Sequence, residues 1–210
     1  MIRIIIADDH EIVRAGLRQL IAGEPDIEVA GEASDGQELI ERLRKNTYDV
    51  VLLDISMPGR SGLDILKQIR IEHPGLPVLI LSTYPEEQYA IRTIKAGASG
   101  YLNKKTLSDE LIGAIRKAHA GGRYITPSLA EIMAESMISD HGGVPHAKLS
   151  DREYQIMLLL ASGKSVSDIS RDLFLSVKTV STHRAKILQK MGLRNNAEIT
   201  HYAVSNRLLD

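Results

Sequence analysis

The 210-residue chain contains no cysteine. Disulfide bonds, thiolate zinc sites and thiol nucleophiles are therefore excluded. The chain also lacks an apolar run of the roughly 18 residues that a membrane-spanning helix needs, because Asp, Arg or Lys interrupts every hydrophobic stretch. The first apolar run begins directly at Ile2, without a signal peptide before it. These absences predict a cytoplasmic protein that has no contact with a membrane.

Net charge is small as well, at −1, and the hydrophobic share of 43% is ordinary for a soluble protein. The length allows one large domain or two modest ones. Charge is unevenly distributed, since no acidic residue lies between Asp172 and Glu198. That window holds five cations, Lys178, Arg184, Lys186, Lys190 and Arg194. A local basic stretch is typical of a surface that binds a phosphate backbone, although a solvated helix face would have the same composition.

Residues 1–118 alternate between strand-like and helix-like patterns. This alternation predicts βαβ units with a parallel sheet, and five such units make a flavodoxin-like doubly wound α/β domain. Helix starts are expected at Ser34-x-x-Gln37, Ser61-x-x-Asp64 and Thr106-x-x-Asp109, which resemble capping boxes. The predicted strands are 3–7, 27–33, 50–54, 78–82 and 100–102, and the predicted helices are 12–21, 36–45, 62–72, 86–95 and 108–118.

The pattern changes after Gly121-Gly122, where no further strand-like run follows. We expect a receiver-sized domain over 1–120, a linker over 121–147 and a small all-α domain of four helices over 148–210. Within the linker, Pro127 favours the first turn of a helix over 127–138, and the stretch 140–145 is typical of a turn. In the last domain, Ser150, Ser165 and Ser176 predict helix starts, Phe174 is expected within the short helix that follows Ser165, and Gly192 predicts a helix end.

Two strands of the first domain are predicted to end in carboxylates. Asp8 and Asp9 follow the first strand, and Asp54 ends the third. In an open parallel sheet, ligands bind outside the carboxyl ends of the strands, so these side chains should converge. Three neighbouring carboxylates repel one another unless a cation lies between them, and hard oxygen ligands favour Mg²⁺.

Two further residues follow strand ends in the same domain, Ser82 and Lys104. A carboxylate cluster with Mg²⁺, an ammonium group and a hydroxyl can together bind a phosphoryl group. A carboxylate such as that of Asp54 is already an ionised nucleophile at pH 7. Each of these residues taken alone is more often a turn, cap or surface residue.

Together these motifs resemble the receiver domain of two-component response regulators over residues 1–120. The matching segments are Ile6-Ala7-Asp8-Asp9, Leu53-Asp54-x-x-Met57-Pro58-Gly59, Ser82-Thr83 and Gly97-Ala98-x-Gly100-Tyr101-Leu102-x-Lys104. The resemblance implies Asp54 as phospho-acceptor and a Mg²⁺ site. The implied metal ligands are Asp9, Asp54, Asp8 partly through water, and the backbone carbonyl of Ser56. It also implies that Ser82 and Lys104 contact the phosphoryl group and that Tyr101 is the aromatic switch residue.

A second pattern lies between Ser176 and Met191. Val177, Val180, Ile187, Leu188 and Met191 form an apolar stripe at helical spacing. The opposite face carries small, polar or basic residues, Lys178, Ser181, Thr182, Ala185, Lys186 and Gln189. A slim, positive helix after a short helix and turn is typical of a helix-turn-helix that enters the DNA major groove. Small helical bundles that bind no DNA show the same pattern.

The sequence motifs of this segment resemble the LuxR-type helix-turn-helix, and the whole chain resembles NarL/FixJ-subfamily response regulators. The matching motifs are Leu149-Ser150-x-Arg152-Glu153, Ala161-x-Gly163-x-Ser165, Asp168-Ile169-Ser170, Leu173-x-x-Ser176-x-x-Thr179-Val180-x-x-His183 and Lys190-x-Gly192. The resemblance implies that Lys178, Ser181, Thr182 and Ala185 face base edges. Thr179, His183, Lys186 and Lys190 would then lie toward the DNA backbone. Ser181 departs from the Lys or Asn of many members, so DNA shape should carry more of the specificity.

We therefore expect a phosphorylation-controlled, sequence-specific transcription regulator. Its implied partners are a sensor histidine kinase, double-stranded DNA with two half-sites, and a second copy of the chain after phosphorylation. A phosphatase or another phosphoryl-transfer hydrolase is the competing interpretation, but the loops after the strands are short and leave no substrate-binding insertion. A phosphorylation-independent DNA-binding protein with a degenerate receiver is a third, which the intact Asp8, Asp9, Asp54 and Lys104 disfavour.

Overall fold

The computed structural model describes residues 1–57, 60–138, 144–206 and 208–209. The chain forms two compact units, Met1–Ala130 and Glu131–Asp210, and each is treated by itself. No helix within the described ranges is long and apolar enough to cross a membrane.

The first unit is built on a five-stranded parallel sheet. The strands are β1 Ile2–Ala7, β2 Ile27–Ala33, β3 Val50–Asp54, β4 Val78–Ser82 and β5 Gly100–Asn103. Their order is β2-β1-β3-β4-β5. Strands β3 and β4 are buried along their whole length, because helices cover both faces of the sheet and leave no solvated side.

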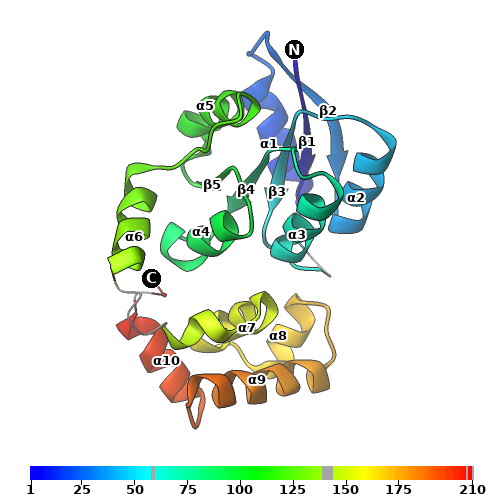
Figure 1. Ribbon diagram of the computed structural model, residues 1–210. Coiled ribbons are helices and arrows are strands. Elements are labelled where there is room, and N and C mark those ends of the chain that lie inside the picture. The colour runs from blue at the N-terminus through cyan, green and yellow to red at the C-terminus, as the bar shows by residue number, and fades with distance from the viewer. Residues whose placement is uncertain (58–59, 139–143, 207, 210) are drawn as a thin grey trace. The chain divides into compact units, whose positions relative to one another are not determined.

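Five helices form the two outer layers (Figure 1). They are α1 Glu11–Ile21, α2 Gly36–Lys45, α3 Gly62–Glu72, α4 Glu86–Lys95 and α5 Leu107–His119. Leu17 of α1 and Leu111 of α5 pack in one core with Ile4, Ile6 and Leu52, so α1 and α5 share one face. Because side chains alternate along a strand, Ile5 and Leu53 point to the other face, which α2, α3 and α4 cover.

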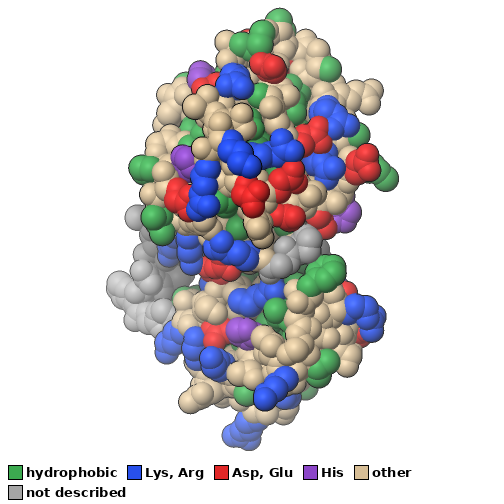
Figure 2. Space-filling view, turned by 90° about the vertical axis from the view of Figure 1, so that its right-hand side faces the viewer, with side chains coloured by type: hydrophobic (Ala, Val, Ile, Leu, Met, Phe, Trp, Pro, Cys, Tyr) green, Lys and Arg blue, Asp and Glu red, His purple; other side chains and the backbone are tan. Residues whose placement is uncertain are grey.

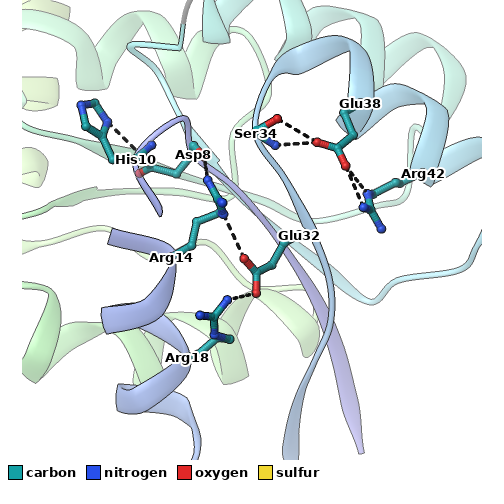
Figure 3. Close-up of polar contacts among 8 residues, drawn as sticks. All are labelled: Asp8, His10, Arg14, Arg18, Glu32, Ser34, Glu38 and Arg42. Atoms are coloured by element: carbon teal, nitrogen blue, oxygen red, sulfur yellow. Dashed lines mark hydrogen bonds and ion pairs between the residues drawn. The ribbon is translucent and has the colours of Figure 1, made fainter. Parts of the chain in front are cut away.

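Two of the three predicted capping boxes in this unit are wrong. At α2 the cap is Asp35, which accepts a hydrogen bond from the Glu38 amide, and not Ser34. Glu38 accepts hydrogen bonds from the amide and hydroxyl of Ser34 (Figure 3). Thr106 makes no side-chain cap at α5. At α3 the Ser61 hydroxyl caps the helix by accepting from the Asp64 amide, and it donates to the Asp64 carboxylate at 2.9 Å.

Residues after α5 extend the first unit and attach the start of α6 Pro127–Ile138 to it. The Tyr124 amide donates to the Ser99 carbonyl. Thr126 caps α6 by accepting from the Leu129 amide at 3.1 Å. The Thr126 hydroxyl donates to both carboxylate oxygens of Glu86, at 2.7 and 2.9 Å, and the Ser128 hydroxyl also bonds to Glu86. The first turn of α6 is therefore fastened to the first turn of α4.

The second unit is all-helical. A short 3-10 turn, η1 Pro145–Lys148, leads into α7 Asp151–Ala161, α8 Val166–Asp172, α9 Val177–Met191 and α10 Asn196–Ser205. Helix α7 lies at the centre and packs against α9 and α10, which is why almost its whole length is buried. Fully buried apolar side chains from each helix form the core, among them Ile156, Ile169, Val180, Ile187, Ile199 and Ala203.

Helix ends in this unit follow the predicted signals closely. Ser150 and Glu153 form a complete capping box at α7, and Ser165 and Ser176 cap α8 and α9. Gly192 ends α9 in the left-handed conformation, with φ of 68°. Phe174 is not helical as expected, because it takes a left-handed φ of 53° after α8 has ended.

The predicted fold class, a doubly wound α/β domain followed by a helical helix-turn-helix domain, is confirmed. The domain limits at 120, 121–147 and 148 remain predictions. Of the expected turn at 140–145, residues 140–143 lie outside the described range, as do Pro58 and Gly59 of the motif after Asp54.

Candidate functional site

The strand order creates a crevice at the carboxyl ends of β1 and β3. These strands are neighbours, yet the chain leaves β1 for α1 on one face and β3 for α3 on the other. Such a switch point leaves the strand ends uncovered, and ligands bind there. Asp8 follows β1 and Asp54 ends β3, so the topology brings two predicted site residues to this crevice.

Lys104 joins the two carboxylates. Its Nζ lies 2.6 Å from Asp8 Oδ2 and 2.9 Å from Asp54 Oδ2. Asp8 is fully buried and Asp54 is 1% exposed. Two buried anions need a compensating cation, and the ammonium group of Lys104 supplies one charge for both.

Burial and neighbouring charges both shift the pKa values of Asp54 and Lys104. Burial raises the pKa of Asp54, Asp8 raises it further, and Lys104 only partly offsets the rise. Burial by itself would lower the pKa of Lys104, but Asp54 and Asp8 outweigh it, so that pKa is raised. The raised pKa means that the charged form of Asp54 is disfavoured here, and a bound cation would stabilise it.

The carboxylates fit a divalent metal ion. Asp8, Asp9, His10 and Asp54 each offer one ligand atom, and these atoms lie within 4.8 Å of one another. Asp54 Oδ2 accepts no hydrogen bond of normal geometry, although Lys104 Nζ is near it, and it is buried. A buried oxygen with lone pairs to spare beside two further carboxylates suits a hard ion such as Mg²⁺.

Ser82 and Tyr101 lie on the adjoining strand ends and are both fully buried. The Ser82 hydroxyl accepts from the Tyr84 amide at 3.0 Å. The Tyr101 hydroxyl donates to the Tyr84 carbonyl at 2.7 Å. The Lys104 amide donates to the Ser82 carbonyl. One loop, after β4, therefore contacts both the serine and the tyrosine that the sequence singled out.

Ser56 contacts the carboxylate oxygen of Asp54 that lies away from Lys104. Its amide donates to Asp54 Oδ1 at 3.1 Å, which holds that oxygen in place. The Ser56 hydroxyl is buried and has no hydrogen-bond partner among the described residues.

Sequence reasoning missed two residues that shape this site, Arg14 and His10 (Figure 3). Arg14 Nη1 donates to the Asp8 carbonyl at 2.7 Å, and its Nε donates to Glu32 at 2.9 Å. Glu32 also pairs with Arg18. Arg14 thus fixes the backbone of the loop that carries the carboxylates. No local pattern links Arg14 to β2, but the His10 that follows Asp8-Asp9 was a readable signal.

In the second unit, the structure places the predicted DNA-facing side of α9 in solvent. Lys178, Ser181, Thr182, Ala185 and Lys186 are exposed, whereas Val180, Ile187 and Met191 are buried. Val177 departs from the predicted apolar stripe, because it is 51% exposed. Its place at the first turn of α9 lies beyond the cover of the other helices.

Several polar side chains of α9 already have partners within the unit. Lys190 Nζ lies 2.6 Å from Glu153 Oε2. The Thr179 and Ser176 hydroxyls are 2.7 Å apart, and the Thr182 hydroxyl donates to the Lys178 carbonyl at 2.9 Å. Arg184 Nε donates to Asn196 at 2.6 Å, which gives Arg184 a structural role.

His183 lies half-buried between Val180 and Ile187 on the inner side of α9, and its Nδ1 is buried without a partner among the described residues. Burial lowers the pKa of His183; Glu153 opposes this, and Lys186, Arg152 and Lys190 lower it further. The lowered pKa favours the neutral form of His183. The exposed cations of the predicted surface are Lys178, Lys186 and Lys190.

The surface charge of the two units differs in kind (Figure 2). The face of the first unit shown there mixes acidic and basic side chains, and ion pairs such as Arg44 with Glu72 at 2.9 Å belong to this unit. On the face of the second unit shown there, the charged side chains are mostly Lys and Arg, with few acidic ones among them. A surface of this charge attracts a phosphate backbone.

Comparison with known families finds a match for each unit of the chain. Residues 4–116 match the response regulator receiver domain, and residues 147–203 match the bacterial regulatory proteins of the luxR family. Response regulator UvrY of Escherichia coli (strain K12) is 39% identical over 209 residues, which cover 99% of this chain and 96% of UvrY. Response regulator GacA of Pseudomonas viridiflava is 36% identical over 211 residues, which cover 100% of this chain and 99% of GacA.

Solved structures of similar proteins include RcsB. A structure of the Salmonella typhimurium RcsB response regulator is 26% identical with a TM-score of 0.64, covering 97% of this chain and 100% of that one. A structure of an RcsB–DNA complex is 26% identical with a TM-score of 0.61, covering 97% and 98%. The chain belongs to the NarL/FixJ-type two-component response regulators, transcription regulators that join a receiver domain to a LuxR-type DNA-binding domain.

Proposed function

We propose that Asp54 is the phospho-acceptor of this regulator and that a sensor histidine kinase is the donor. An Asp54 carboxylate oxygen attacks the phosphorus of a phosphohistidine in line, the P–N bond breaks, and the imidazole leaves with the electron pair. The observation that carries the proposal is the buried Asp54 beside the Lys104 ammonium at 2.9 Å. That ammonium can follow the negative charge from the carboxylate to the phosphoryl oxygens.

Asp8, Asp9, Asp54 and the backbone carbonyl of Ser56 would hold Mg²⁺. The ion supplies positive charge that neutralises the phosphoryl oxygens as the new bond forms. Lys104 and the Ser82 hydroxyl bind the remaining oxygens. We propose that phosphoryl turnover in this chain is limited to loss of the group from Asp54 itself.

Phosphorylation would then act through the loop after β4. The Ser82 hydroxyl now accepts from the Tyr84 amide, and the Tyr84 carbonyl accepts from Tyr101. A phosphoryl group that draws the Ser82 hydroxyl toward itself breaks the first contact and changes the position of the second. This biases a two-state equilibrium on the surface formed by α4 and α5, with Tyr101 as the switch residue.

The output is DNA recognition by α9. We infer that Lys178, Ser181, Thr182 and Ala185 meet base edges in the major groove, while Thr179, His183, Lys186 and Lys190 lie toward the phosphates. A regulator of this type binds two half-sites as a homodimer, and two RcsB dimers have been seen on two parallel DNAs. The limits 1–120, 121–147 and 148–210 are our proposed division into receiver, linker and DNA-binding domain.

The acceptor is tested by incubating the chain with Mg²⁺ and acetyl phosphate and measuring intact mass. We expect one added phosphoryl mass in the wild type and in Asp109→Asn, a control on the exposed start of α5, and none in Asp54→Asn. Persistence of the added mass in Asp54→Asn would assign the acceptor to another residue.

A further inference from the structure

The carboxylate site has a feature that three aspartates do not account for, the imidazole of His10. His10 Nδ1 lies 3.0 Å from Asp9 Oδ1 and 3.4 Å from Asp8 Oδ1, and Figure 3 shows the ring beside Asp8. The ring is 66% exposed. Burial against a hydrophobic core therefore does not explain its position, which places a nitrogen among the oxygens of the site.

The backbone fixes this arrangement. The His10 amide donates to Asp8 Oδ1 at 2.9 Å, and Arg14 Nη1 holds the Asp8 carbonyl at 2.7 Å. His10 is also the residue directly before α1, and its carbonyl accepts from the Val13 and Arg14 amides. The turn that carries Asp8, Asp9 and His10 is thus held at both ends, and the three side chains start from a defined geometry.

We propose that His10 supplies a nitrogen ligand to the metal site and biases it toward divalent ions softer than Mg²⁺. The ligand atoms of His10 and the three aspartates lie within 4.8 Å of one another, and the buried Asp54 Oδ2 still has lone pairs to offer. Imidazole binds Co²⁺, Ni²⁺ or Zn²⁺ far better than Mg²⁺, which keeps oxygen ligands and water. His10 would therefore join the coordination of a softer ion and leave that of Mg²⁺ unchanged.

This inference rests on the metal site of the proposed function, and binding measurements separate the two. Co²⁺ and Mg²⁺ are titrated into the full chain by calorimetry, and visible absorption reports the ligands of bound Co²⁺. His10→Ala should lower Co²⁺ affinity at least about tenfold, the lower end of what loss even of an outer-shell partner costs, and change the Co²⁺ spectrum. Its Mg²⁺ affinity should stay within about twofold of wild type.

Two controls make the result decisive. His119→Ala, an exposed histidine at the end of α5, should leave both affinities unchanged, which removes non-specific binding to surface histidines as the cause. Asp9→Asn should lower the affinity of the chain for both Co²⁺ and Mg²⁺. Equal Co²⁺ affinity in His10→Ala and wild type overturns the role of His10 alone, whereas a wild type that binds neither ion overturns the metal site itself.

Discussion

Each unit of the chain contains a lysine, Lys104 or Lys190, that pairs with a buried carboxylate. Lys104 balances Asp8 and Asp54 in the first unit, and Lys190 Nζ lies 2.6 Å from Glu153 in the second. Glu153 is only 3% exposed and also accepts from the Ser150 amide. A buried carboxylate that loses its partner is costly, so Lys190 of α9 stabilises the fold of the second unit through its pair with Glu153.

The Glu153 pair predicts a pH dependence of stability. Burial alone would raise the pKa of Glu153, but Lys190 and Ser150 outweigh it, so the folded-state pKa is lowered. Because the pKa is lowered, the stabilisation is complete above the pKa of a glutamate in the unfolded chain, about 4.3. It is lost as pH falls through the pKa of Glu153 in the folded protein. Glu153→Gln should therefore destabilise the second unit by about 1 kcal/mol at pH 7 and by less below pH about 4.

Hydrogen exchange in α7 and α9 of the full chain measures this difference. Lys190→Gln should destabilise these helices similarly at pH 7, and the double variant should lose less than the sum of both, because the two side chains share one interaction. A Glu153→Gln effect of the same size at pH 7 and in acid would show that packing, not charge, is lost.

At the scale of elements, the contact between α4 and α6 attaches the start of α6 to the first unit. Glu86 accepts hydrogen bonds from Thr126 and Ser128, and it lies two residues after Tyr84, whose carbonyl holds Tyr101. The first turn of α6 is thus part of the first unit, consistent with its extent to Ala130. Glu86 therefore links the segment after β4 to the first turn of α6.

Glu86→Ala should release the start of α6 from α4. Amide exchange over residues 124–134 should accelerate, because the three hydroxyl contacts to the carboxylate are lost and the first turn of a helix depends on its cap. Glu87→Ala is the matched control, since it removes a charge from the same turn of α4 at an exposed position. Equal exchange in Glu86→Ala and Glu87→Ala would leave the contact without a role in holding α6.

At the scale of the whole molecule, the function that we propose requires phosphorylation of one unit to change DNA binding by the other. The exposed cations on α9, Lys178, Lys186 and Lys190, lie far along the chain from Asp54 and belong to a unit that folds around its own core. Binding free energy from phosphates is electrostatic and independent of sequence. In the recognition that we propose, specificity comes from the small side chains of α9 and from DNA shape.

Lys186→Ala should weaken binding to every DNA sequence and reduce the slope of log affinity against log salt by about 1. Fluorescence anisotropy over a salt series measures both. Lys45→Ala removes the same charge from an exposed position in α2 and should leave the slope unchanged. Unaltered binding in Lys186→Ala would remove that residue from the DNA interface.

Local patterns in the sequence determined most of the fold. Continuous apolar runs predicted strands buried on both faces, and Ser61, Ser150, Ser165 and Ser176 marked helix starts, because these signals depend on neighbours within a few residues. The capping predictions failed at Ser34, where the adjacent Asp35 is the cap, and at Thr106, whose hydroxyl donates to the Asn103 carbonyl at 3.4 Å.

The candidate site, like the fold, was predicted only in part from the sequence. Asp8, Asp9, Asp54 and Lys104 were predicted because strand ends in a parallel sheet must meet at one edge. The role of Arg14 depends on Glu32, the cap on α6 depends on Glu86, and the burial of His183 depends on how α9 packs. Those pairings join residues far apart in the chain, so the sequence by itself determined which chemistry gathers at the strand ends. Only the tertiary structure decided which polar groups are already satisfied and which remain free to bind a ligand.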